Sequence, residues 1–178
     1  FKYHENIYNE NEKIVLGVAS TWDRRKGLAD FVNLRNHLPE KYKIVLIGLN
    51  KEQIEELPNG IIGISRTENI EELVNWYNKA SVFINPTYVD NFPTTNVESL
   101  ACGTPVITYN TGGSPEAINS QTGIVVEKGN IKKLTEAILK QKKNKEVIKL
   151  CRETSELFFD SSQRFNDYLK LYTKFKTG

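Results

Sequence analysis

Short runs of Val and Ile recur along the chain, and each run is followed by a stretch with helical spacing. Strands that are apolar on both faces are typical of a parallel sheet with helices on both sides. Because crossover connections are right-handed, the pattern predicts an α/β fold with a doubly wound parallel sheet, which is Rossmann-like. The expected strands are Lys13–Ala19, Lys43–Gly48, Gly60–Ile64, Ser81–Asn85, Thr104–Tyr109 and Gly123–Val126, and the expected helices are Gly27–Leu38, Lys51–Leu57, Ile70–Lys79, Asn96–Ala101, one capped by Asn130, and Ser161–Phe175.

The length of 178 residues suits one domain, with a core over about 13–140 and C-terminal helices over 144–178. The chain contains no Met, even at position 1, which indicates a piece of a longer protein. A net charge of +2 gives no reason to expect nucleic acid as a partner. Cys102 and Cys151 are too few for a disulfide framework, so we expect buried thiols in a reducing cytoplasm.

The basic run over residues 140–145 is interpreted as a solvated face or loop. Peripheral contact with a membrane is the alternative, although the run lacks aromatic anchors. No apolar run is long enough to span a bilayer, and the first ten residues contain no signal-peptide block. The expected location is the cytoplasm, with the inner face of the membrane as the alternative.

The sequence lacks the motifs of several common catalytic and nucleotide-binding sites. No two of the 11 glycines stand two positions apart and no Gly precedes Lys, so dinucleotide and P-loop motifs are absent. The stretch Gly112–Glu116 lacks the closing Gly of a nucleophile elbow. His4 and His37 lie away from the expected strand ends, and no Asp-x-Asp pair exists. We therefore expect neither a metal nor a cofactor.

Three polar segments follow expected strands, and ligands bind at the carboxyl ends of strands in doubly wound sheets. These segments are Ser20–Gly27, Asp90–Glu98 and Gly112–Glu116. The middle segment leads into a helix that begins near Thr95. Its free N–H groups and partial positive charge suit a phosphate group.

Lys26 and Arg25 add whole positive charges from the neighbouring loop. With the helix N-terminus, they would neutralise a diphosphate without a metal. Asp90 and Glu98 stand on either side of this phosphate site, and carboxylates accept hydrogen bonds from hydroxyl groups. A ligand with a diphosphate centre and hydroxyls at both ends is a nucleotide sugar, so the three segments together predict a nucleotide-sugar site.

Each signal also has a purely structural interpretation. Thr95 and Glu98 have the spacing of a capping box, in which Glu98 would only close the helix end. Asp90 would only fix a turn ahead of Pro93, and Lys26 would belong to a solvated basic cluster. The joint placement of these residues at strand ends is what favours a binding site.

The segment Asn85–Glu116 also carries a resemblance. It holds an acidic residue eight positions before Glu98, then "ACGTPVI" and "GGSPE". This combination resembles the C-terminal domain of family 4 glycosyltransferases (glycosyl transferases group 1), which have the GT-B fold, and the likeness covers about Lys13–Lys140. It implies a retaining transferase of hexosyl type that moves a sugar from a nucleoside diphosphate sugar to a hydroxyl, in glycan or polysaccharide biosynthesis. It also implies an N-terminal acceptor domain that this sequence lacks, and the last expected helix would contact that domain. The fragment alone is therefore expected to be inactive.

The resemblance implies residue roles by position. Lys26 matches the basic residue that binds the donor phosphates and stabilises the departing diphosphate. Asp90 matches the first acidic position, which contacts the transferred sugar, and these two are the catalytic candidates. Glu98 matches the second Glu, which holds the ribose hydroxyls. The further donor-binding candidates are Asn91, Phe92 and Pro93 beside the sugar, Thr94 and Thr95 at the phosphates, and Gly48, Ile64 and Arg66 beside the nucleoside.

Two positions depart from the family pattern. Asp90 replaces Glu and is one methylene shorter, so the sugar is expected to differ. Ser20 and Thr21 stand where the family has Arg, which leaves Arg25 as the candidate second charge, and all three are expected to bind the donor. Two other functions stay open: a nucleotide-sugar epimerase of the same fold, for which the expected histidines are lacking, and a non-catalytic nucleotide-sugar-binding module.

Overall fold

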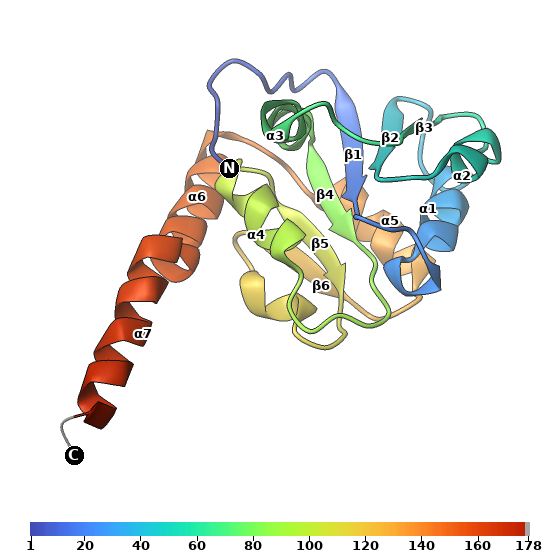
Figure 1. The fold of residues 1–178 in the computed structure, drawn as a ribbon. Helices are drawn as coiled ribbons and strands as arrows, with labels where there is room; N and C mark the ends of the chain where they lie inside the picture. The colour runs from blue at the N-terminus through green and yellow to red at the C-terminus, as the bar shows by residue number, and fades with distance from the viewer. Residues whose placement is uncertain (177–178) are drawn as a thin grey trace.

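Six parallel strands form one sheet with the order β3-β2-β1-β4-β5-β6, as Figure 1 shows for the computed structural model. The structure describes residues 1–176, without the side chains at positions 161, 162, 164 and 174–176. The strands are β1 (Lys13–Val18), β2 (Tyr42–Ile47), β3 (Ile61–Ile64), β4 (Val82–Asn85), β5 (Val106–Tyr109) and β6 (Gly123–Val126). The helices are α1 (Leu28–Arg35), α2 (Lys51–Glu55), α3 (Ile70–Lys79), α4 (Thr94–Ala101), α5 (Ile131–Lys140), α6 (Lys145–Phe159) and α7 (Ser161–Lys176), with short 3-10 helices η1 (Arg24–Lys26) and η2 (Ser114–Ala117).

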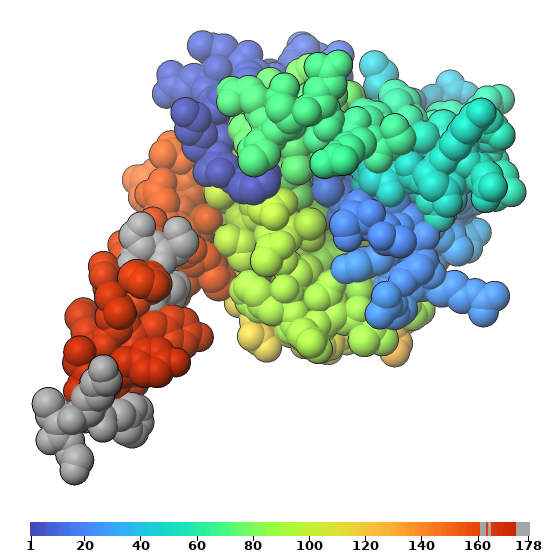
Figure 2. Space-filling model, in the orientation of Figure 1, coloured from blue at the N-terminus to red at the C-terminus, as the bar shows by residue number. Residues whose placement is uncertain are grey.

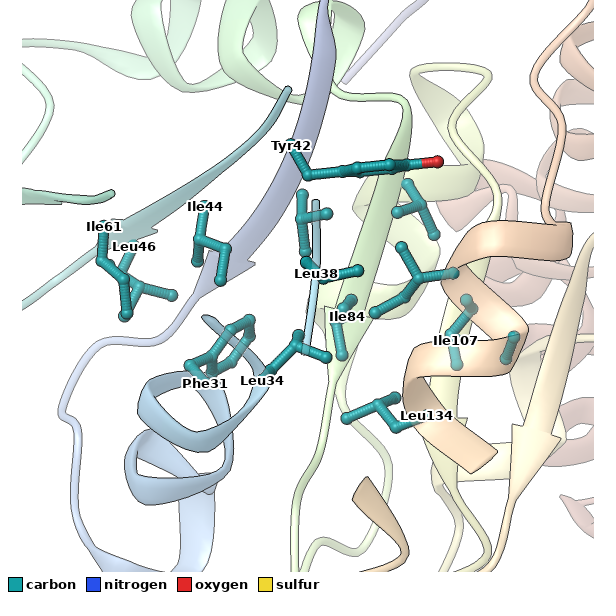
Figure 3. Close-up of a cluster of buried hydrophobic side chains, with 14 of the residues drawn as sticks. Phe31, Leu34, Leu38, Tyr42, Ile44, Leu46, Ile61, Ile84, Ile107 and Leu134 are labelled. Atoms are coloured by element: carbon teal, nitrogen blue, oxygen red, sulfur yellow. The ribbon is translucent and has the colours of Figure 1, made fainter. Parts of the chain in front are cut away.

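The apolar strands bury both faces of the sheet, because successive side chains of a strand point to opposite faces. In β2, Ile44 and Leu46 pack in one cluster, while Val45 and Ile47 pack in the other. The first cluster lies under α1 and α5 and is drawn in Figure 3. The second lies under α3, α4 and α6. The predicted doubly wound parallel sheet is therefore confirmed.

Most predicted elements are present with ends that differ by one to three residues. The predicted bounds of α3 and β6 match those of the structure, and Asn130 caps α5 through its side chain. Both cysteines are buried, as expected. Residues 177 and 178, the end of the predicted C-terminal helical region, lie outside the described residues.

The interpretation of residues 140–145 as a uniformly solvated basic run is wrong at Lys143, which is 6% exposed. Its Nζ donates hydrogen bonds to the carbonyls of Asn78 and Ala80 and to Oγ1 of Thr104, at 2.7–2.9 Å. Asn78 and Ala80 stand at the end of α3, where carbonyl groups lack helical partners. Lys143 therefore caps α3 from the segment that joins α5 to α6.

The C-terminal helices leave apolar side chains in solvent. α7 extends away from the sheet in Figures 1 and 2. Leu157 and Phe158 of α6 and Phe165, Tyr168 and Tyr172 of α7 are each more than half exposed. Within the part of the chain that the structure describes, no helix has both the length and the apolarity needed to cross a bilayer.

We expect replacement of Lys143 by Met to make stability depend less on pH. Burial lowers the pKa of Lys143 to about 7, whereas an unfolded lysine titrates near 10.4. Because the unfolded chain binds the extra proton between these values, the contribution of Lys143 is lost as pH falls toward 7 and is complete above about 10.4. Urea unfolding of wild type and Lys143→Met should therefore show a stability difference that shifts in favour of wild type as pH rises from about 7 to about 10.

The neighbouring lysine provides the control, because Lys142 is exposed. Lys142→Met should differ from wild type by a constant amount across the same pH range. An equally constant difference for Lys143→Met would contradict the assignment of a lowered pKa to the buried amine.

Candidate functional site

The sheet order reverses between β1 and β4, and this is where ligands bind in doubly wound folds. Both strands point toward the same edge of the sheet, and the loops that follow them are joined there. The backbone N–H of Tyr88 donates to the carbonyl of Arg25 at 2.7 Å, and Oγ1 of Thr87 donates to the same oxygen at 3.1 Å. The loop after β4 is therefore fixed to the loop after β1.

These joined loops bring Lys26 and Asp90 into contact. Lys26 ends η1, and its Nζ lies 2.7 Å from Oδ2 of Asp90. The two side chains are 31% and 15% exposed, so the ion pair is partly shielded from water. Asp23 caps η1 and binds the guanidinium of Arg25 at 2.7 Å. Arg25 is thus paired within its own loop, whereas Lys26 reaches across to the loop after β4.

The backbone of the Asp90 loop rests on the two glycines that follow β5. The N–H of Gly113 donates to the carbonyl of Asp90 at 3.2 Å. A Cβ atom on Gly112 would lie 2.0 Å from the Asp90 carbonyl oxygen, and one on Gly113 would lie 1.8 Å from that of Asn91. Only glycine permits this backbone contact, so the two glycines of the GGSPE segment fix the position of the Asp90 loop.

The helix α4 begins at Thr94, four residues after Asp90, and Pro93 at its N-cap supplies no side-chain hydrogen bond. The first amides of a helix have no acceptor within it, and Thr94 is exposed to solvent. This helix start therefore combines unpaired donors with a partial positive charge next to the Lys26–Asp90 pair.

A buried polar network holds this helix start in place. The side-chain amide of Asn96 donates to the Ser114 carbonyl at 2.9 Å, and its oxygen accepts from Asn85 at 3.0 Å. Oγ1 of Thr108 donates to the Asn85 carbonyl and lies 2.6 Å from Oγ of Ser114. All four residues are at most 7% exposed. The network connects α4 to β4, β5 and η2.

Glu98 does not close a capping box with Thr95, so that structural alternative is wrong. Its Oε2 instead accepts a hydrogen bond from the hydroxyl of Tyr77 on α3 at 3.0 Å. Burial raises the pKa of Glu98, while hydrogen bonds from Tyr77 and Thr94 and the chain's α-amino group oppose that rise. Glu98 also lines a cavity of about 340 Å³ together with Phe1 and other residues of the N-terminal segment, α4 and α6.

The other predicted site residues lie around this edge of the sheet. Gly48 directly follows β2, Ile64 ends the neighbouring β3, and the Gly48 N–H donates to the Ile64 carbonyl at 2.9 Å. Arg66 is exposed and lines a hollow at the start of α3. Phe92 packs its ring 5.7 Å from that of Phe159. Ser20 and Thr21 are exposed after β1, as are Asn91 and Thr94 beyond β4, while Pro93 is buried.

Sequence reasoning missed the residues that support the site. The helical spacing of Ile70–Lys79 places Tyr77 on the apolar face of α3, and this spacing gives no indication of the partner of its hydroxyl. Asn96 and Ser114 lay inside motifs but received no role. One signal was available for Asn96, which lies between Thr95 and Val97 in a helix that packs on the sheet. A buried polar side chain in such a helix needs a hydrogen-bond partner.

A parallel sheet with this strand order and its switch point between β1 and β4 defines a doubly wound, Rossmann-like domain, the kind of domain from which GT-B proteins are built. The chain matches the family described as "Glycosyl transferases group 1" over residues 12–144, which is most of its length. It belongs to that family, as the sequence motifs indicated.

Individual relatives are similar at lower identity. CapM of Staphylococcus aureus, a capsular polysaccharide biosynthesis glycosyltransferase, is 28% identical over 149 residues, which are 78% of this chain and 38% of CapM. An N-acetylgalactosaminyltransferase of Campylobacter jejuni that acts on N,N'-diacetylbacillosaminyl-diphospho-undecaprenol is 28% identical over 97% of this chain and 47% of its own. The chain thus spans less than half the length of these relatives.

Solved structures share the fold. Sucrose-phosphate synthase from Thermosynechococcus elongatus aligns with a TM-score of 0.82 at 25% identity, over 95% of this chain and 47% of the synthase. Anabaena HepE, solved with UDP-glucose, aligns with a TM-score of 0.75 at 16% identity, over 91% of this chain and 49% of HepE.

We expect Asn96→Ala to destabilise the chain by about 3 kcal/mol, because it leaves the Asn85 amide and the Ser114 carbonyl without a buried partner. Urea unfolding followed by circular dichroism measures the loss. Asn110→Ala is the control, since Asn110 is exposed, and it should change stability by less than about 0.5 kcal/mol. Similar losses in the two variants would show that the buried network does not stabilise the start of α4.

Proposed function

We propose that this chain binds the nucleoside diphosphate sugar of a retaining glycosyltransferase that transfers a hexosyl group to a hydroxyl acceptor. One observation carries the proposal: Lys26 and Asp90 are in contact at the sheet's switch point, beside an uncapped helix start. That arrangement offers positive charge for phosphates and a carboxylate for hydroxyls within one small region.

The charges suit a diphosphate leaving group. When a glycosidic bond to a diphosphate breaks, negative charge grows on the departing phosphate oxygen. Lys26 and the amides at the start of α4 are donors that are already in place to meet that charge. Asp90 holds Lys26 until the donor arrives and then accepts hydrogen bonds from the sugar hydroxyls. Lys26 and Asp90 are thus the proposed catalytic residues.

The remaining contacts are proposed by their position along the same edge. Glu98 accepts hydrogen bonds from the ribose hydroxyls, while Thr94 and Thr95 donate backbone N–H groups to the phosphates. HepE, which shares the fold, was solved with UDP-glucose, and this supports a nucleotide sugar as the ligand class. The absence of an Asp-x-Asp pair favours binding without a metal.

The acceptor side is proposed to come from a second domain. The chain spans 38% and 47% of the two curated relatives, and both relatives are glycosyltransferases. CapM acts in capsular polysaccharide biosynthesis, which supports a polysaccharide or another glycan as the product. The 178-residue chain by itself is expected to bind a donor without transferring its sugar.

Calorimetric titration with UDP, GDP and ADP and with their hexose conjugates tests donor binding. We expect at least one nucleotide to bind, and Lys26→Ala to weaken it by about tenfold because a charged hydrogen bond to phosphate is lost. Lys149→Ala is the control, since Lys149 is an exposed, ion-paired lysine on α6. EDTA should leave the affinity unchanged. Absence of binding by every nucleotide would rule the proposal out.

A kinetic comparison in the complete enzyme tests the role of Lys26 in the reaction. Lys26→Ala should lower kcat by about 10²–10³-fold, because charge on the leaving group is stabilised mainly in the transition state. The donor KM should change much less. A raised donor KM with kcat unchanged would instead assign Lys26 to binding alone. Conversion of the donor without an acceptor would indicate an epimerase.

A further inference from the structure

Tyr77 is a buried tyrosine whose hydroxyl has one partner, the carboxylate of Glu98. The O–H donates to Oε2 of Glu98 at 3.0 Å, and the residue is 0% exposed. A buried tyrosine hydroxyl usually has a hydrogen-bond partner, and the partner of this one is a residue of the proposed ribose site. The hydroxyl is therefore a candidate for a functional contact.

The rest of the molecule holds Tyr77 rigidly. Its ring packs edge-on against Phe83 of β4 at 5.4 Å and against Phe1 at 5.9 Å. Its backbone carbonyl accepts a hydrogen bond from Oγ1 of Thr104, which in turn accepts one from the buried Lys143. With ring and backbone both fixed, the phenolic oxygen has a defined position from which to orient a flexible Glu side chain.

Glu98 needs such a partner, because its carboxylate is partly buried. Burial raises the pKa of Glu98, and the Tyr77 hydrogen bond opposes that rise by favouring the charged form. A carboxylate has two oxygens with several acceptor sites, so the hydrogen bonds from Tyr77 and Thr94 leave acceptor sites for a ligand. The other groups near Glu98 are Thr94 of α4, Cys102 directly after α4 and the α-amino group of Phe1. Lys2, Arg152, Glu156 and Asp160 line the same cavity.

We propose that Tyr77 is a positioning residue for nucleotide binding, whose hydroxyl keeps the Glu98 carboxylate ionised and oriented to accept hydrogen bonds from ribose. This inference rests on the proposed function, in which Glu98 contacts the ribose. It adds a residue on α3, outside the loops that follow the strands, to the determinants of donor affinity. It also makes that affinity dependent on pH.

The test is Tyr77→Phe, which keeps the packed ring and removes only the hydroxyl. Tyr109→Phe is the matched control, because Tyr109 is equally buried and its hydroxyl donates to a different carboxylate, Asp30, at 2.8 Å. Titration of the Glu98 side-chain carboxyl by ¹³C NMR should show a higher midpoint in Tyr77→Phe than in wild type. Tyr109→Phe should leave that midpoint unchanged.

Nucleotide binding provides the second readout, with whichever of UDP, GDP and ADP binds wild type most tightly. Because ribose needs the ionised carboxylate, affinity should fall as pH drops through the Glu98 pKa, and in Tyr77→Phe this fall should begin at higher pH. The loss should be largest, at about tenfold, at the acidic end of the titration, and should narrow to about threefold at alkaline pH, where Glu98 is ionised in both proteins. The 2′,3′-dideoxy nucleotide should bind both proteins equally.

The two measurements show which part of the inference is wrong if the expected results are not obtained. An unchanged Glu98 midpoint in Tyr77→Phe overturns the positioning role, whatever binds. A shifted midpoint with equal loss for the ribose and dideoxy nucleotides overturns the contact to ribose. Failure of wild type to bind any of the three nucleotides overturns the proposed function, and the inference with it.

Discussion

Two hydrogen bonds to a single carbonyl oxygen hold the candidate site together. Tyr88 and Thr87, after β4, both donate to the carbonyl of Arg25, after β1. A parallel sheet brings the ends of its strands to one edge, but it leaves the loops beyond them free to move. These two hydrogen bonds fix the position of Lys26 relative to Asp90, so the two opposite charges are paired without a ligand. Such preorganisation is what makes electrostatic stabilisation effective in a binding cleft.

The α4 side of the site depends on buried polar groups. The side chains of Asn85, Asn96, Thr108 and Ser114 each have partners within the same small network. Because an unpaired polar group in the interior is costly, the start of α4 cannot shift without penalising several groups at once. The N-terminal end of α4 is therefore held in position by buried residues behind it.

The sequence was informative wherever a local pattern decided the outcome. The Val- and Ile-rich runs predicted the sheet, and the rule that ligands bind at strand ends predicted that Lys26 and Asp90 would lie close together. The pattern failed where the partner is distant in sequence. Lys143 looks solvated within a basic run, yet its acceptors lie more than 35 residues away. Tyr77 looks like an ordinary core residue, because the periodicity of α3 does not reveal where its hydroxyl points.

The contact between the Gly112–Gly113 backbone and the Asp90–Asn91 backbone has an evolutionary consequence. The course of the Asp90–Asn91 loop is determined by main-chain atoms, so the side chains at positions 90 and 91 can vary while their anchor stays constant. A family that must serve many glycans can exchange recognition chemistry there without rebuilding the scaffold. The two glycines cannot vary in this way, because a side chain at either position would displace the loop.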